Sequence, residues 1–251
     1  MRNFWSASFA VVLGLAVAAR ADDQASAKAV IEKAVKATGG EEVLTKLTGT
    51  DVKFKGKWYG MGEGIPYTGQ TLAQIPNKLR FQVDLDVGGM KFQFIQVVDG
   101  EKGWISANSA TMEMDKDALE EAKHQLYVER ILSLVPLLKD KEFTLAPLGE
   151  IKVGDQTAVG VKVSSKGHRD VNLYFSKDKG LLLKAETQVK DPMQGGQEFH
   201  QSVVYSDFKD VSGRQVPMNV RIERDGKLYV DGETTEVKLT EKLDDSLFAK
   251  P

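Results

Sequence analysis

The sequence contains no cysteine among its 251 residues, and this absence excludes several kinds of chemistry at once. A chain without thiols has no disulfide framework, no thiolate metal site, no thiol nucleophile and no dithiol redox motif. Its fold must therefore be held by a hydrophobic core, which a chain of this length can supply. An exported protein of this composition fits a bacterial periplasm better than a eukaryotic secreted scaffold.

Histidine is also scarce, since only His124, His168 and His200 occur and they lie far apart in the sequence. No H-E-x-x-H or H-x-H pair is present, so we expect neither a metal site nor a bound cofactor. The G-x-S-x-G elbow and the P-loop are missing too. The glycine-rich stretch Gly60–Gly64 has no helix after it, so it predicts a hairpin tip rather than a phosphate loop. These absences favour a protein that is not an enzyme.

Neither sign of charge is in excess, because 34 basic residues stand against 36 acidic residues. The net charge of −2 gives no electrostatic reason to expect a nucleic acid as partner.

The N-terminal residues have the pattern of a signal peptide. Arg2 precedes an apolar stretch, Phe9–Ala19, and the small-residue pattern Ala19-Arg20-Ala21 follows. We predict cleavage after Ala21, with residues 1–21 as signal peptide and residues 22–251 as a single mature domain, periplasmic or secreted. The apolar stretch is short for a bilayer, and no later run is long enough, so no transmembrane segment is expected in the mature chain.

The mature chain is expected to begin with a helix. Five apolar residues recur at helical spacing, and Gly39-Gly40 is a typical helix end. The stretch Glu41–Leu47 predicts a short second helical turn. The five apolar residues are Ala27, Val30, Ile31, Ala34 and Val35.

From Thr50 onward the hydrophobic period changes to two, which is typical of strands. The segment 79–87 alternates apolar and polar residues, and Gly88-Gly89 separates it from a similar segment that begins at Met90. These segments predict an antiparallel hairpin with one apolar face turned inward. The inward residues are expected to be Leu79, Phe81, Val83 and Leu85.

The rest of the chain predicts a meander of strands. Turn signals such as Lys179-Gly180 and Asp225-Gly226 separate alternating segments at close intervals, without the helix–strand alternation of a parallel sheet. We therefore predict a mainly β fold with helices, of the α+β class. About ten antiparallel strands would form either a barrel or an open half-barrel.

One helical insert stands out from this pattern. We expect helix from Asp115 to Lys139, with Pro136 kinking or ending it. Its second half, from Ile131 to Leu138, is apolar on most sides. Such a segment either fills the core or acts as a lid over an apolar interior.

Several stretches together resemble the LolA-like and LolB-like periplasmic lipoprotein-carrier superfamily, including its uncharacterised branch. They are KATGGEEVLTKL, GKWYG, IPNKLRFQV, QVVDGEKGWIS, VNLYFSKDKGLLLKAE and VVYSDFKDVSGRQVPMNVRI. The resemblance covers nearly the whole mature chain. It implies an open antiparallel β half-barrel with an N-terminal helix and a helical lid or plug on its concave side. In the carriers, that apolar interior accepts the acyl chains of a lipoprotein.

We therefore expect a non-enzymatic carrier or binding protein for a lipid or an acylated protein. Trp104 is ambiguous, because it would either line the ligand site or pack within the sheet. A structural or sensor module that binds an envelope protein through its sheet is the alternative, and an enzyme with an unrecognised site is a further one. A filled interior would favour the module. The expected lining residues are Phe81, Phe92, Phe94, Trp104, Ile131, Leu134, Val135 and Leu138.

Overall fold

The computed structural model describes residues 11–191 and 195–251, with side chains described from residue 23 onward. One continuous antiparallel sheet dominates it, with the strand order β6-β5-β4-β3-β2-β1-β13-β12-β11-β10-β9-β8-β7. The strands are β1 (Gly49–Trp58), β2 (Ile65–Gln74), β3 (Lys78–Val87), β4 (Met90–Asp99), β5 (Lys102–Ala107), β6 (Ala110–Glu113), β7 (Thr144–Val153), β8 (Gln156–Ser164), β9 (Val171–Ser176), β10 (Leu182–Asp191), β11 (Gln197–Val211), β12 (Arg214–Arg224) and β13 (Lys227–Thr240).

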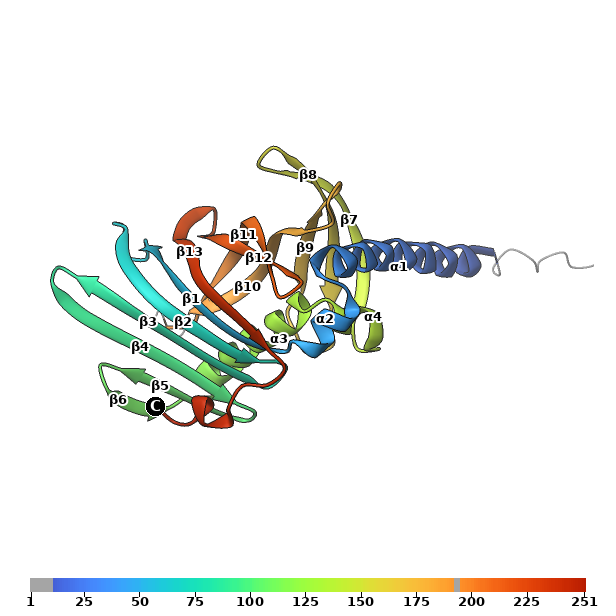
Figure 1. Cartoon of the computed structure of the whole chain (residues 1–251). Helices are drawn as coiled ribbons and strands as arrows, with labels where there is room; N and C mark the ends of the chain where they lie inside the picture. Colours follow the sequence, from blue (N-terminus) through green and yellow to red (C-terminus); the bar gives the residue numbers. More distant parts are fainter. Residues whose placement is uncertain (1–10, 192–194) are drawn as a thin grey trace, which may run out of the picture.

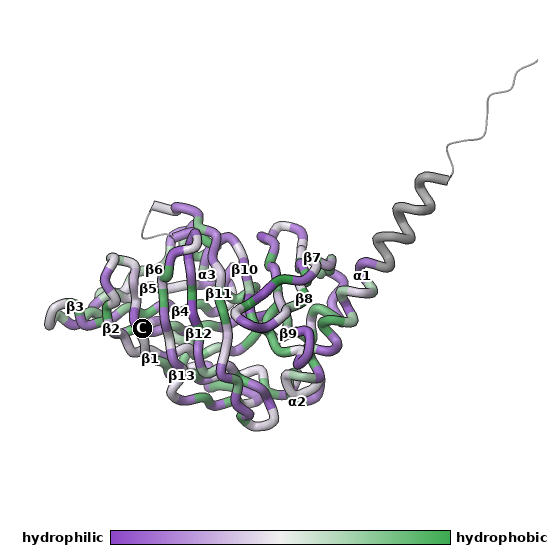
Figure 2. The backbone as a smooth tube through the Cα atoms, turned by 90° about the horizontal axis from the view of Figure 1, so that it is seen from above, coloured by the Kyte–Doolittle hydropathy of each residue, from purple (hydrophilic) through white to green (hydrophobic). Residues whose placement is uncertain are grey.

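The sheet is open, because β6 and β7 form its two edges and do not pair with each other. It curves around the helices, which lie on its concave side (Figure 1). Apolar and polar residues alternate along the strands, and the hydropathy colouring in Figure 2 shows this alternation. The predicted α+β class and the open antiparallel half-barrel are confirmed.

The hairpin of β3 and β4 has the predicted register. Val87 lies opposite Met90 across Gly88-Gly89, and Leu79 lies opposite Val98. Residues directly opposite in an antiparallel pair share a face, so this register fixes which side chains point inward. Leu79 is 4% exposed and packs beneath a helix, which makes the face of Leu79, Phe81 and Val83 the concave one.

The two N-terminal helices also follow the prediction. Helix α1 (Val11–Thr38) ends just before Gly39, and α2 (Glu41–Lys46) follows directly. The apolar stripe of α1 packs on the concave side of β7, β8 and β9, where Ile31 is fully buried. Residues 1–10 of the predicted signal peptide lie outside the described residues, and from residue 11 across the predicted cut only the backbone of α1 is described.

The helical insert is interrupted next to Pro136, as predicted, but the break precedes the proline and a short helix resumes through it. Helix α3 (Lys116–Leu132) begins at Asp115, whose side chain accepts a hydrogen bond from the Ala118 amide at 2.8 Å. A second helix, α4 (Val135–Lys139), carries Pro136 in its first turn. The break lies at Leu134, whose φ of 66° is outside the helical region, and Pro136, which has no amide hydrogen to donate, stands in the first turn of α4 where none is needed.

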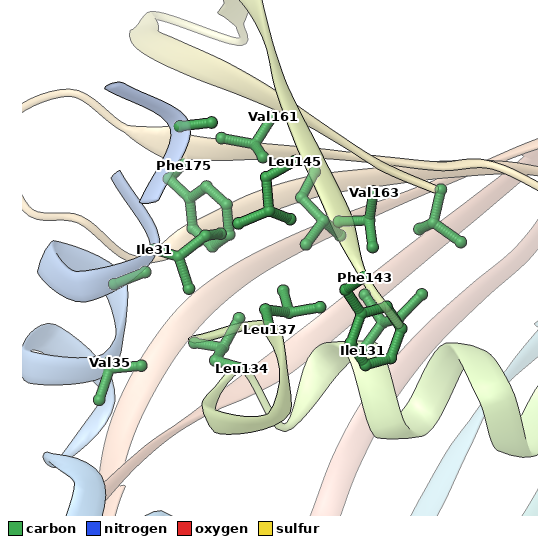
Figure 3. Packing of buried hydrophobic residues seen from close by; sticks show 14 of the residues in the cluster. Ile31, Val35, Ile131, Leu134, Leu137, Phe143, Leu145, Val161, Val163 and Phe175 are labelled. Atoms are coloured by element: carbon green, nitrogen blue, oxygen red, sulfur yellow. The ribbon is translucent and has the colours of Figure 1, made fainter. Parts of the chain in front are cut away.

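The apolar run after the break fills a core. Ile131, Leu134 and Leu137 have 0%, 2% and 2% exposure, and they meet side chains of α1, β7, β8 and β9 (Figure 3). The break allows Leu134 and Leu137 to turn into this cluster beside Ile31, as the close view shows. This part of the concave side is therefore closed by packed side chains.

The convex side has a small core of its own. The C-terminal turn η2 (Asp245–Phe248) places Phe248, which is fully buried, against Leu72, Ile95 and Val97. Lys78 holds this turn through an ion pair with Asp245 at 3.0 Å. Within the described residues, no helix is long and apolar enough to cross a membrane.

Candidate ligand-binding face

The topology requires the α3–α4 segment to cross the open side of the half-barrel. The segment follows β6, which is one edge of the sheet, and precedes β7, which is the other edge. The start of α3 packs on β4 and β5, and its end packs with the cluster of α1, β8 and β9. Helix α3 therefore runs across the concave face rather than along one strand (Figure 1).

One face of α3 changes from buried to exposed along the helix, and this change shows where the helix leaves the sheet. Ala118, Ala122, Gln125 and Glu129 recur at spacings of four, three and four, so they share a face. The two alanines are buried against β2, β3 and β4, whereas Gln125 and Glu129 are exposed. Gln125 accepts a hydrogen bond from Gln96, which lies opposite Phe81 on the concave face, at 2.7 Å. On this face, the second half of α3 is therefore not covered by packed side chains.

Beyond α3, the concave face is lined with aromatic rings that remain partly exposed. Phe54, Tyr67 and Phe81 come from three neighbouring strands and form one ring cluster. The Phe54 and Phe81 centroids are 6.0 Å apart with an interplanar angle of 15°, and the Phe54 and Tyr67 centroids are 5.9 Å apart. Phe92 and Phe94 extend this face along β4, because they lie opposite Leu85 and Val83.

Glycines in the neighbouring strands leave room for these rings. Gly69 lies directly opposite Phe54, and a Cβ at that position would be 2.4 Å from the Phe54 ring. Gly56 and Gly232 lie beneath the Tyr67 hydroxyl, where added Cβ atoms would be 2.8 and 2.7 Å from the oxygen. Rings over glycine are a known means of covering a bare stretch of sheet. Burial in this position raises the pKa of Tyr67 to about 12, and the Asp231 charge adds to the effect.

The end of the sheet farthest from α3 carries a second aromatic group. Trp58 and Tyr229 meet edge to face with centroids 6.2 Å apart. The guanidinium of Arg224 lies 3.8 Å from the Tyr229 ring centroid and forms an ion pair with Asp191 at 2.9 Å. At this end the concave face is both aromatic and charged, so the row of rings ends at a polar border.

Two polar side chains interrupt the apolar concave face on β11 and β12. They are Tyr205 and Arg214, and the charge of Glu129 on α3 acts on the pKa of each. Removal from bulk water raises the pKa of the Glu129 carboxyl, and the Arg214 charge opposes this shift. Burial likewise lowers the pKa of Arg214 and raises that of Tyr205 above its usual range.

Glu129 combines an exposed side chain with a carboxyl whose pKa is raised by desolvation. Among the described residues, neither Glu129 nor Arg214 has a side-chain hydrogen bond or an ion pair.

The structure separates the predicted lining residues into three groups. Phe81, Phe92 and Phe94 lie together on the concave face. Ile131, Leu134 and Val135 are buried in the core, with Leu138 partly buried against it, so this segment packs rather than lining an open surface. Trp104 lies opposite Val97 and packs with the convex cluster around Phe248, on the other side of the sheet.

Sequence reasoning missed Phe54, Tyr67 and the polar group of Glu129, Tyr205 and Arg214. The strand alternation of β1 and β2 could have pointed to Phe54 and Tyr67. The polar group comes from three distant segments, and no local spacing signals it.

A separate polar cluster holds α3 to the β8–β9 loop and β10. Arg169 donates to the buried Glu121 at 2.7 Å, and the Tyr127 ring stacks on His168 with centroids 4.0 Å apart. Buried His124 lies 3.4 Å from the Thr187 hydroxyl. Desolvation, with the charges of Arg169 and His168, lowers the pKa of His124 to about 4.

This cluster has the character of a helix anchor. Its rings are stacked within the protein, and its carboxylate is already paired. No group of three or more potential metal ligands occurs among the described residues.

The sequence matches no family model and no curated protein. Solved structures with a similar fold include a LolA superfamily protein from Nitrosomonas europaea, with 14% identity, a TM-score of 0.56 and coverage of 89% of this chain and 97% of that one. A DUF1329 family protein from Desulfovibrio piger has 13% identity, a TM-score of 0.54 and coverage of 89% and 97%. A domain described as an outer membrane lipoprotein-sorting protein from Vibrio parahaemolyticus has 9% identity, a TM-score of 0.53 and coverage of 88% and 97%. The chain therefore has the LolA-like fold.

Proposed function

We propose that this protein is a non-enzymatic carrier for a lipid or an acylated protein in the bacterial periplasm. The observation that supports this most directly is the partly exposed aromatic face of Phe54, Tyr67, Phe81, Phe92 and Phe94. A soluble protein gains stability by burying such rings, so a contiguous face left open indicates a binding surface. Its curvature and its position beyond α3 suit an acyl chain lying across the strands.

The likeness in fold supports the same proposal. The Vibrio parahaemolyticus domain is described as an outer membrane lipoprotein-sorting protein, and the shared fold covers 88% of this chain. Fold alone does not carry a function, so the proposal depends on the open aromatic face. The predicted signal peptide supports the proposed periplasmic location.

Native mass spectrometry of protein purified from its own periplasm tests this proposal. We expect a co-purified mass that corresponds to a lipid or an acyl chain, and displacement of it by a fluorescent fatty acid. Phe81→Asp places a charge among the rings and should weaken binding of the fatty acid at least tenfold. Thr68→Asp is the matched control, because Thr68 is exposed on the convex side between Lys55 and Asp84. Wild-type protein without any apolar ligand, bound or added, would refute the carrier.

A further inference from the structure

Arg224 stands out on the concave face because its guanidinium is fixed from several sides. The Tyr229 ring centroid lies 3.8 Å from the guanidinium carbon and the Phe199 ring centroid lies 5.4 Å from it, both within cation–π range. Nε donates to the side-chain oxygen of Gln201 at 3.2 Å, and Nη1 donates to Asp191 at 2.9 Å. The side chain of Arg224 is only 18% exposed, so these contacts hold the guanidinium in one orientation.

One nitrogen of this guanidinium is not used by these contacts. Nη2 has no hydrogen bond to any residue that the structure describes, and it is not one of their buried atoms without a partner, so it is open to solvent. A guanidinium with an open edge suits a carboxylate, which it binds through charge-assisted hydrogen bonds. The ion pair with Asp191 does not prevent this, because Arg130 in the same fold pairs with both Asp140 and Glu142.

A β-bulge places the Tyr229 ring beside this group. Strand β13 has one extra residue opposite β12, and that residue is Tyr229. Alternation along the strand would otherwise turn its ring to the convex side, since the neighbouring Val230 lies opposite Trp58 on the concave face. The bulge instead brings the ring over Arg224, with its centroid 6.2 Å from that of Trp58. Bulges often re-aim a side chain in this way next to a functional site.

Trp58 connects the guanidinium to the aromatic face. It follows Phe54 by four residues on β1, so both side chains lie on the concave face. Arg224 is four residues along β12 from Val220, which pairs into the row of residues beneath the Tyr67 ring. Four residues of a strand span about 13 Å, which is shorter than a long acyl chain. A chain that lies on the rings can therefore bring its head group to Arg224.

We infer that the ligand is a long-chain amphiphile with a carboxylate head group, which binds Nη2 of Arg224 while its chain lies along Trp58 and the aromatic face. This inference deepens the proposed function and rests on it, because the chain must bind on the concave face. A cationic head group would meet the like charge of the guanidinium. A neutral head group would gain a hydrogen bond without the help of charge, so it should bind more weakly.

Three ligands with the same oleyl chain test the inference on the mature protein. Oleate is anionic, oleamide is its neutral isostere and oleylamine is cationic, and each is titrated below its aggregation concentration against the neutral fluorescent probe N-phenyl-1-naphthylamine. We expect oleate to bind about tenfold more tightly than oleamide, with oleylamine the weakest. Arg224→Gln should reduce the preference for oleate to about one. Asp191→Asn should strengthen the binding of oleate alone, because it removes a competing charge and keeps an acceptor for Nη1.

Arg221→Gln provides a matched control, because it changes an exposed guanidinium that pairs with Glu223 on the convex side of β12. It should keep the wild-type preference. Since Arg224→Gln removes an ion pair and can lower stability, Asp191→Asn supplies an independent test in protein that retains the guanidinium.

The possible outcomes separate the inference from the proposed function. Equal binding of oleate and oleamide, unchanged by Arg224→Gln and Asp191→Asn, would overturn the inference and leave the carrier intact. Tighter binding of oleylamine, lost in Asp191→Asn, would also overturn it and assign the polar end of the face to the carboxylate. Failure of all three ligands to bind would refute the carrier, and the inference with it.

Discussion

At the scale of single residues, glycine decides where the concave rings can lie. Gly69→Ala would place a methyl group 2.4 Å from the Phe54 ring and 2.5 Å from the Gln82 carbonyl oxygen. The ring can turn away, but the carbonyl belongs to the sheet and cannot. We expect a loss of stability of about 1–3 kcal/mol, measured by urea unfolding. In a Phe54→Ala background the added loss should be smaller, and an equal loss in both backgrounds would show that the ring is not involved.

His124 gives a second prediction, for the dependence of stability on pH. Its pKa falls from 6.5 in the unfolded chain to about 4 in the folded protein, chiefly through desolvation. The unfolded chain therefore binds more protons between these values. The contribution of the neutral ring is fully present above pH 6.5 and is lost as the pH falls toward 4.

The measurement compares wild type with His124→Gln. The difference between their unfolding free energies should change across pH 4 to 6.5 by up to a few kcal/mol, at about 1.4 kcal/mol per unit of pKa difference. His200→Gln is the control, because His200 is exposed on β11. A difference curve that is as flat for His124→Gln as for His200→Gln would contradict the burial of His124.

At the scale of elements, the break between α3 and α4 matters most. Leu134 is 2% exposed at the point where the chain turns. Leu134→Asp would bury an unpaired carboxylate in the main core, at a cost of several kcal/mol. We expect loss of soluble expression or a strongly lowered melting temperature. Lys141→Asp, on the exposed surface nearby, should leave the melting temperature nearly unchanged. A folded Leu134→Asp protein that has only lost ligand binding would instead support a lid.

The elements also show how far sequence reasoning reaches. The alternation in 79–87 and the turn at Gly88-Gly89 predicted the β3–β4 register correctly, because both signals are local. Pro136 predicted an interruption of the helix, but not its position at Leu134, since helical periodicity continues through that residue. Phe81 and Trp104 lie on opposite faces because of how β3, β4 and β5 pair in the sheet, which no local pattern shows. Local sequence patterns therefore predict the strands. The candidate binding face also depends on the sheet edges and the crossing helix, which no local pattern predicts.

At the scale of the whole molecule, the first prediction concerns export. The small residues Ala19 and Ala21 predict that the mature protein begins at Asp22. N-terminal sequencing of the protein from the periplasmic fraction measures this directly. Replacing Ala19 and Ala21 by bulkier leucines should block cleavage, whereas Ala37→Leu, in the mature helix, should not. Exported protein that still begins at Met1 would contradict the prediction.

Binding to the open face should also stabilise the molecule as a whole, because a ligand that binds only the folded state shifts the folding equilibrium toward it. At a ligand concentration 100 times the dissociation constant, the gain is about 2.7 kcal/mol. For a chain of this size, this corresponds to a rise in melting temperature of roughly 5–10 °C. We expect the rise for wild type with a saturating fatty acid, and its loss in Phe81→Asp. Trp104→Phe should keep the full rise, because Trp104 packs on the convex side with Phe248. Loss of the rise in Trp104→Phe but not in Phe81→Asp would place the ligand on the other face of the sheet.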